Sequence, residues 1–187
     1  DKLTGFDFIS PGLSLNPDTY KFLFSLAGEI KDFKKNYPRR RPLDTWLIYL
    51  IGILEPLEIA SVKKSCRKFV FSKGEEKRII SFKKAAAKVS SALSKKDASA
   101  NIIYELLEPL SYEVILAIKA KYRNPGLKAH IEDFFEIYNG MRILISGYDL
   151  RKMGLTPGPY YQKVFAKVLN AKLEGKVKTR GQELELI

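Results

Sequence analysis

The sequence contains few of the residues on which many catalytic and metal-binding sites depend. It has one cysteine and one histidine among 187 residues. A single cysteine excludes an internal disulfide and a zinc site built from several thiolates, and a single histidine excludes a histidine metal pair. We therefore expect Cys66 to be a small core residue. We expect His130 to be a surface residue or a helix residue whose hydrogen bonds are satisfied.

Long apolar runs and signal-peptide features are also missing. The longest apolar run, Trp46 to Leu54, has about nine residues, whereas a membrane span needs roughly 18. No amino-terminal stretch has the pattern of a signal peptide, so we expect a cytoplasmic protein without a membrane partner. The sequence begins at Asp1 without an initiator methionine, and we expect a processed chain or a part of a longer protein.

Nucleotide-binding and metal-binding motifs are absent as well. The segment 153–159, MGLTPGP, has two glycines, but no strand precedes it and no Gly-Lys-Ser/Thr follows. It is therefore neither a Walker A loop nor a dinucleotide fingerprint. Glu183 and Glu185 have the spacing of a two-carboxylate metal site, but they fall in the last residues. We interpret them as structural residues on an exposed tail, and we predict no catalytic residue in this chain.

Helical periodicity dominates the sequence. Asn16 followed by Pro17 predicts a helix start, and apolar residues then recur at helical spacing. The almost wholly apolar segment 45–54 predicts a buried central helix, with Asp44 as its cap. Short loops, regular caps and the lack of period-two runs predict an all-α fold.

Two parts of the chain are expected within this all-α fold. Residues 1–140 are predicted to form a compact multi-helix body domain. Residues 141–187 are predicted to form a small helical tail domain, which contains the motif GxDLxxxGxxPGP and a corner like that of a helix-turn-helix at TPGP.

The net charge of +12 is concentrated in three segments. Residues 63–96 contain twelve basic and two acidic residues, residues 31–41 contain six and one, and residues 138–187 contain nine and four. The other segments are net acidic, so the positive potential belongs to particular surfaces.

The most basic segment is predicted to include a helix with two distinct faces. Ser72 and Glu75 have the spacing of a capping box, and the helical pattern runs to about Leu93. Its apolar residues cluster within roughly 80°, and a group of lysines falls within roughly 60° on the opposite side. These lysines are Lys73, Lys77, Lys84 and Lys88, with Lys95 added if the helix continues that far. Such a face is either a solvated helix surface or a site for the phosphates of a polyanion. The lack of alternating acidic residues favours a polyanion.

The segment 147–165, GYDLRKMGLTPGPYYQKVF, predicts a corner between two helices. Gly154 is placed to end the first helix in a left-handed conformation, with Leu155 folding back as an apolar contact. Pro159 suits the first turn of the next helix. The free amides at that helix start, with no side chain on Gly158, predict a small seat for an anion such as a phosphate.

This corner and the residues after it resemble a known family. Segment 146–184 is similar to the carboxy-terminal region of the bacterial tRNA nucleotidyltransferase and poly(A) polymerase family. The family pattern is G-x-D-L, a glycine, P-G-P, a helix, and an acidic-Gly-x-Val-x-[ST]-[RE] ending. The matching residues are Gly147, Asp149, Leu150, Gly154, Pro157, Gly158, Pro159, Leu169, Gly175, Val177, Thr179 and Arg180. Segment 44–57 and the helices after it are similar to the helical body of the longer bacterial members.

One position departs from the family pattern. The family usually has a further glycine where Gln162 stands, which alters helix approach or phosphate access there. Tyr160 and Tyr161 beside it either stack on exposed bases or cover the corner.

The resemblance implies a division of labour. In this family a separate amino-terminal head carries the metal-binding carboxylates, a neck selects the nucleotide, and the body and tail hold tRNA. The head's glycine-rich turn and acidic pair are absent, and segment 132–136, EDFFE, lacks the arginine of the neck motif. The resemblance therefore implies that Mg²⁺ and a nucleoside triphosphate bind the missing head. The resemblance also implies that this chain needs no cofactor of its own, and that its partners are tRNA and the head and neck of the same polypeptide.

The leading hypothesis is a tRNA-binding carboxy-terminal region that anchors the tRNA elbow and T-arm so that the 3′ end reaches the absent head. The alternatives are a helical protein-interaction module with basic faces and a sequence-independent binder of the DNA backbone. The parent's reaction is predicted to be nucleotide addition to an RNA 3′ end, of CCA, A alone or poly(A). The candidate RNA-binding residues are Lys73, Lys77, Lys84, Lys88, Arg39, Arg40, Arg41, Gly154, Pro157, Gly158, Pro159, Tyr160, Tyr161, Lys163, Lys178 and Arg180.

Overall fold

The computed structural model describes residues 6, 9, 10 and 13–187, and these residues fold into helices without strands. This confirms the predicted all-α fold. The elements are α1 (Pro17–Asn36), α2 (Thr45–Ile53), α3 (Ile59–Lys68), α4 (Lys73–Leu93), α5 (Ala100–Leu107), α6 (Tyr112–Tyr122), α7 (Pro125–Asp133), the π-helical turn η1 (Phe134–Tyr138), α8 (Gly147–Lys152), α9 (Pro159–Leu173) and α10 (Arg180–Glu185).

Local sequence signals set the first helix starts. Asn16 Oδ1 accepts a hydrogen bond from the Thr19 amide at 2.8 Å, and Pro17 lies in the first turn of α1. Asp44 precedes α2 as predicted, but its side chain makes no capping hydrogen bond. Its carboxylate contacts Arg78 of α4 instead. The residue expected to cap α2 therefore forms an ion pair with α4.

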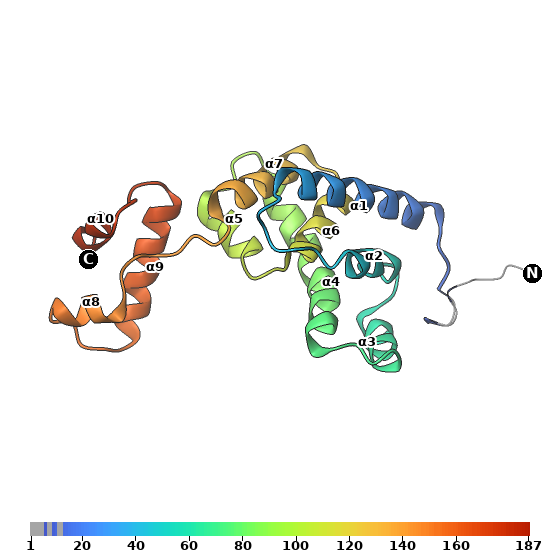
Figure 1. Cartoon of the computed structure of the whole chain (residues 1–187), viewed down its shortest axis with the longest axis horizontal. Helices are drawn as coiled ribbons and strands as arrows, with labels where there is room; N and C mark the ends of the chain where they lie inside the picture. The colour runs from blue at the N-terminus through green and yellow to red at the C-terminus, as the bar shows by residue number, and fades with distance from the viewer. Residues whose placement is uncertain (1–5, 7–8, 11–12) are drawn as a thin grey trace, which may run out of the picture.

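The central helix of the body is α6. Its residues 113–118 and Ala120 are buried, and it packs against α1, α2, α4 and α7, as its place in Figure 1 indicates. Segment 45–54 was predicted to be the buried central helix, and one side of it is buried through Leu47, Ile48, Ile51 and Leu54. However, α2 leaves Trp46 49% exposed, and the central position belongs to α6. An apolar run shows a tendency to be buried, but it does not determine which helix lies at the centre.

The buried apolar residues form two clusters. The larger cluster consists of residues between positions 13 and 135, and the smaller one consists of residues between positions 145 and 168. Figure 1 shows α8, α9 and α10 beside the other helices, joined to them by an extended segment. α5 contacts α9, and Asn101 Nδ2 donates a hydrogen bond to Glu174 Oε1 at 3.2 Å. The domain boundary predicted between residues 140 and 141 falls between the clusters and stays a prediction.

The single cysteine and the single histidine are both buried. Cys66 is buried, as expected. His130 is buried, and its Nδ1 lies 2.9 Å from the Leu93 carbonyl oxygen, so it is a satisfied helix residue. Among the described helices, none combines the length and the apolar character of a membrane span.

Candidate nucleic-acid interface

The start of α4 is fixed by the predicted capping box. The Glu75 amide donates to Ser72 Oγ at 3.3 Å, and the Ser72 amide donates to Glu75 Oε2 at 2.7 Å. One side of the helix is buried through Ile79, Phe82, Ala86, Val89 and Leu93. The helix ends at Leu93, so Lys95 lies beyond it. The two predicted faces of this helix are therefore present.

The opposite side of α4 carries four exposed lysines, which we call the lysine face: Lys73, Lys77, Lys84 and Lys88. Within the described residues, no carboxylate lies within 4.0 Å of any of these four ammonium groups. A face of unneutralised lysines attracts polyanions, because each ammonium group can replace a counterion at a phosphate.

The other two long basic side chains in the middle of α4 point into the fold. Arg78 forms an ion pair with Asp44 and lies 3.6 Å from a carboxylate oxygen of Glu113. Lys83 Nζ donates to the Glu55 carbonyl oxygen at 2.6 Å, and burial lowers the pKa of this lysine. The helix therefore separates its structural cations from those of the lysine face, which the charge count alone did not show.

A shallow groove follows the lysine face where α3 packs against α4. Its volume is about 510 Å³, and its walls include Lys63, Lys73, Lys77 and Lys84. Glu76 is the acidic residue in this lining. The groove gives the positive side chains a common concave surface.

The three consecutive arginines have different positions in the structure. Arg39 is exposed. Arg40 donates to the Phe135 carbonyl oxygen at 2.6 Å. Arg41 donates two hydrogen bonds, each 2.8 Å, to the two carboxylate oxygens of Glu113. The expectation that all three form one RNA-binding cluster is corrected, because the guanidinium groups of Arg40 and Arg41 bond to the body itself.

Glu113 is the buried centre of this ion-pair network. Its side chain is fully buried, and the Asp44 amide also donates to it at 3.2 Å. Burial alone raises the pKa of Glu113, but the hydrogen bonds from Arg41 and from backbone amides outweigh it and lower the pKa from 4.5 to about 2. The network joins the turn before α2 to α4 and α6. Sequence patterns missed it because Arg41 and Glu113 are 72 positions apart.

The corner after α8 has the predicted geometry at Gly154. This glycine has φ +84°, and its amide donates to the Arg151 carbonyl at 3.0 Å. The Leu155 amide donates to the Leu150 carbonyl at 3.1 Å, which completes the hydrogen bonds of a Schellman motif. The left-handed end predicted for α8 is confirmed.

The start of α9 is open to solvent. Pro157, Gly158, Pro159 and Tyr160 are all exposed, and Gly158 occupies the N-cap position. A Cβ atom built on Gly158 would meet nothing within 4 Å, and its φ of 171° is extended backbone. This fold therefore does not require glycine here, whereas an anion approaching the helix start would benefit from it. The phosphate seat stays a prediction.

Tyr161 is a core residue of the tail. Its ring is buried, it lies beside Gly147, and its hydroxyl donates to the Leu155 carbonyl at 2.9 Å. The ring is therefore not accessible for stacking on a base. Of the two alternatives from the sequence, Tyr161 covers the corner, and its place among the RNA-binding candidates is corrected. Tyr160 keeps an exposed ring.

The two ends of the tail motif meet in space. Asp149 Oδ2 accepts hydrogen bonds from the Ser146 amide at 2.8 Å and from its hydroxyl at 2.9 Å, and these bonds lower the pKa of Asp149. Arg180 forms an ion pair with the same carboxylate. Arg180 therefore has a structural partner, while Lys163 and Lys178 are exposed. The pairing gives a structural reason for an Asp and an Arg at these motif positions.

Glu183 also has a structural role, but it is buried and not exposed. Its side chain is fully buried, and it accepts hydrogen bonds from the Leu144 amide at 2.6 Å and the Ile145 amide at 3.0 Å. Lys172 Nζ lies 2.6 Å away. Burial raises the pKa of Glu183, but these bonds outweigh it and lower the pKa. The structural interpretation is confirmed for Glu183, which is buried rather than on an exposed tail, whereas Glu185 is exposed as expected.

Metal ligands do not gather in the described part of the chain. No group of three or more His, Cys, Asp and Glu side chains is arranged there to hold a metal ion. The described residues therefore offer no three-ligand site for Mg²⁺.

No protein-family model matches the chain. The chain is nevertheless similar in sequence to a tRNA nucleotidyltransferase, in agreement with the resemblance noted in its sequence. Among curated proteins, the A-adding tRNA nucleotidyltransferase of Geobacter sulfurreducens is 27% identical over 184 residues. The similarity covers 96% of this chain and 21% of that enzyme, so the chain spans about a fifth of its relative's length.

Solved structures agree on the fold. The CCA-adding enzyme of Thermotoga maritima in complex with tRNA matches with a TM-score of 0.75 at 22% identity, over 98% of this chain and 45% of that one. An unliganded CCA-adding enzyme, apo form II, matches with a TM-score of 0.73 at 23% identity, over 98% of this chain and 43% of that one. At these identities the likeness shows the fold.

Proposed function

We propose that this chain is the RNA-binding part of a larger tRNA nucleotidyltransferase-like protein. In this proposal it holds tRNA at the elbow and T-arm while a separate catalytic head acts on the 3′ end. The observation that carries the proposal is the lysine face of α4, which has four exposed ammonium groups and no neutralising carboxylate among the described residues. The similarity to an A-adding tRNA nucleotidyltransferase makes tRNA the polyanion that fits best.

The geometry of the lysine face suits a phosphate backbone. Its first and last residues, Lys73 and Lys88, are fifteen positions apart, which is about 22 Å along a helix axis. Lysines spread over this length can neutralise several phosphates at once without reading bases. RNA shape then decides specificity, because the deep groove of duplex RNA offers little sequence to side chains.

The tail supplies further contacts in this proposal. The open start of α9 offers backbone amides to a phosphate, and Tyr160 has a ring available for stacking. Lys163 and Lys178 add exposed positive charge, as Arg39 does on the body. These contacts position the RNA but do not select its sequence.

The catalytic work belongs to other parts of the parent protein. A head carrying the acidic residues would bind Mg²⁺ and the nucleoside triphosphate, and a neck would select the nucleotide. The proposed partners of this chain are therefore tRNA and that head and neck, in the cytoplasm. Assayed alone with tRNA and ATP or CTP, the chain should add no nucleotide.

Filter binding over a salt series tests the proposal. The chain should bind a tRNA transcript more tightly than a DNA duplex of equal charge, and the affinity should fall steeply between 50 and 200 mM salt, by roughly a factor of 10³ if six phosphates are contacted. Equal affinity for the duplex would favour a DNA-backbone binder. Absent or salt-insensitive tRNA binding would reject the proposal in favour of a protein-interaction module.

A further inference from the structure

The turn between α3 and α4 contains an exposed apolar side chain, that of Val70. Val70 follows the end of α3 with φ +54°, and its side chain is 88% exposed. Its amide donates to the Arg67 carbonyl at 3.2 Å, and the Phe71 amide donates to the Cys66 carbonyl at 3.0 Å. These are the hydrogen bonds of a Schellman motif, in which this position is usually glycine.

Valine is an unfavourable residue at this position for two reasons. The left-handed conformation crowds a β-branched side chain, which makes such a residue an outlier there. Exposure also leaves its apolar surface in water. Glycine or asparagine would keep both hydrogen bonds without this strain, since the backbone makes them. The benefit of Val70 is therefore expected to come from a partner outside the folded chain.

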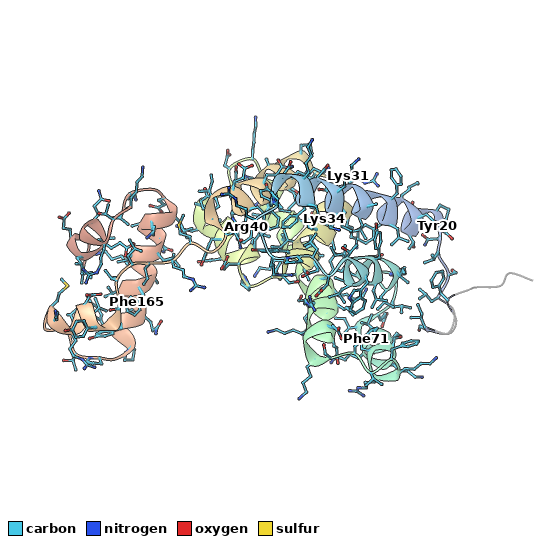
Figure 2. The ribbon with its side chains drawn as sticks, viewed as in Figure 1. Tyr20, Lys31, Lys34, Arg40, Phe71 and Phe165 are labelled. Atoms are coloured by element: carbon cyan, nitrogen blue, oxygen red, sulfur yellow. The ribbon has the colours of Figure 1, made fainter. Side chains whose placement is uncertain are left out.

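Aromatic rings extend the apolar surface beside Val70. The rings of Trp46 and Phe71 are 6.0 Å apart, and those of Phe71 and Phe69 are 6.2 Å apart. Trp46 and Phe69 are both partly exposed. Figure 2 shows Phe71 at the α3 end of α4, where the lysine face begins. We call Trp46, Phe69, Val70 and Phe71 the aromatic corner.

The charges around the aromatic corner are mostly positive. Lys63, Lys64, Arg67, Lys68 and Lys73 are exposed on the two helices that form it. Glu75 uses a carboxylate oxygen to cap α4 through the Ser72 amide. The groove beside the lysine face runs between the same two helices. A polyanion that binds the lysine face would therefore reach the aromatic corner.

We propose that the aromatic corner packs against the exposed face of a nucleobase in RNA whose phosphates bind the lysine face. This inference rests on the proposed function and adds a base contact to it. Aromatic and apolar side chains next to basic ones are the usual platform for unstacked bases, because every base has a π-face. Neither the tail motif nor the charge pattern indicated this site, since the strain at Val70 is visible only in the fold.

The first test compares two polyanions, a tRNA transcript and inorganic polyphosphate, which has no bases. Val70→Gly and Val70→Asn should weaken tRNA binding on the order of tenfold and leave polyphosphate binding unchanged. Ile102→Asn, which removes another exposed apolar side chain, from α5, should change neither. Lys77→Ala with Lys84→Ala should weaken both. Binding to anionic phosphatidylserine vesicles is measured as well. If the wild type binds these vesicles more tightly than Val70→Gly does, while the tRNA affinities are equal, the aromatic corner contacts a membrane and not RNA.

The second test uses Trp46, the single tryptophan of the chain. Its fluorescence should be quenched by tRNA and not by polyphosphate, and the quenching should fall in Val70→Gly.

Both Val70 variants should melt no lower than the wild type, since they relieve the left-handed strain. The inference is overturned if the Val70 variants bind tRNA normally, if Ile102→Asn loses as much affinity, or if Val70→Asn melts clearly lower. In those cases the proposed function is still supported if tRNA binding depends on salt and is weakened by Lys77→Ala with Lys84→Ala. No tRNA binding at all would reject both.

Discussion

Glu113→Gln should destabilise the body by removing the negative centre of its buried ion-pair network. In the wild type, Arg41 binds both carboxylate oxygens at 2.8 Å, and the pKa of Glu113 falls from 4.5 to about 2. Each pKa unit corresponds to about 1.4 kcal/mol, so this change is worth about 3 kcal/mol at pH 7. Arg41 is 45% exposed, and water screens its side of the pair, so we expect a loss of about 2 kcal/mol.

The same pair predicts an acid-sensitive window. Because the folded-state pKa of Glu113 is below its ordinary value, the stabilisation is complete above pH 4.5 and is lost as the pH falls towards about 2. Urea unfolding followed by circular dichroism at several pH values measures this. Wild type should lose stability through the window, and Glu113→Gln should lose about 2 kcal/mol less over it.

A matched control separates burial from charge. Glu105→Gln makes the same chemical change at an exposed position on α5 and should leave both the stability and its pH dependence unchanged. A stabilising role for the Glu113 charge is excluded if Glu113→Gln unfolds at the wild-type urea concentration at pH 7, or if the two variants have the same pH profile. Arg41→Ala should also weaken the fold, and at temperatures where it stays folded its tRNA affinity should match the wild type.

The remaining predictions concern close packing and the tail. Gly158→Thr keeps a good N-cap residue and places its Cβ in open space, so the melting temperature should hold while tRNA affinity falls; normal affinity would reject the phosphate seat. Gly52→Ala brings a Cβ to 2.8 Å from two leucine methyl groups of α1, one of them in buried Leu26, and should cost about 1–3 kcal/mol in urea unfolding. Gly28→Ala, with nothing within 4 Å, is its control and should not destabilise. Glu183→Gln should speed amide hydrogen exchange in α8–α10 and leave α6 protected; uniform protection in both parts would contradict the structural role of this carboxylate.

Much of the local structure was predictable from the sequence, because short-range hydrogen bonds decide it. The Ser72–Glu75 box, the Asn16 cap and the left-handed Gly154 each depend on residues within a few positions of one another. The two faces of α4 follow from the helical period alone.

The rest of the site depended on features of the fold that helical periodicity does not contain. Arg41 and Glu113 are 72 positions apart, so an arginine in a basic run looked like part of an RNA surface. Tyr161 looked like Tyr160 in sequence, but the fold buries one ring and exposes the other. Val70 gave no signal, since a valine after a helix does not by itself predict φ +54°.

The salt dependence of tRNA binding tests the central claim about the lysine face most directly. Lys77→Ala with Lys84→Ala removes two unneutralised charges, whereas Lys21→Ala with Lys176→Ala removes two that already pair with Asp18 and Glu174. Both pairs change the net charge equally. We expect the slope of log K against log salt to fall by about 1 to 2 in magnitude for the first pair and not for the second. An equal change in both slopes, or none in the first, would contradict this claim.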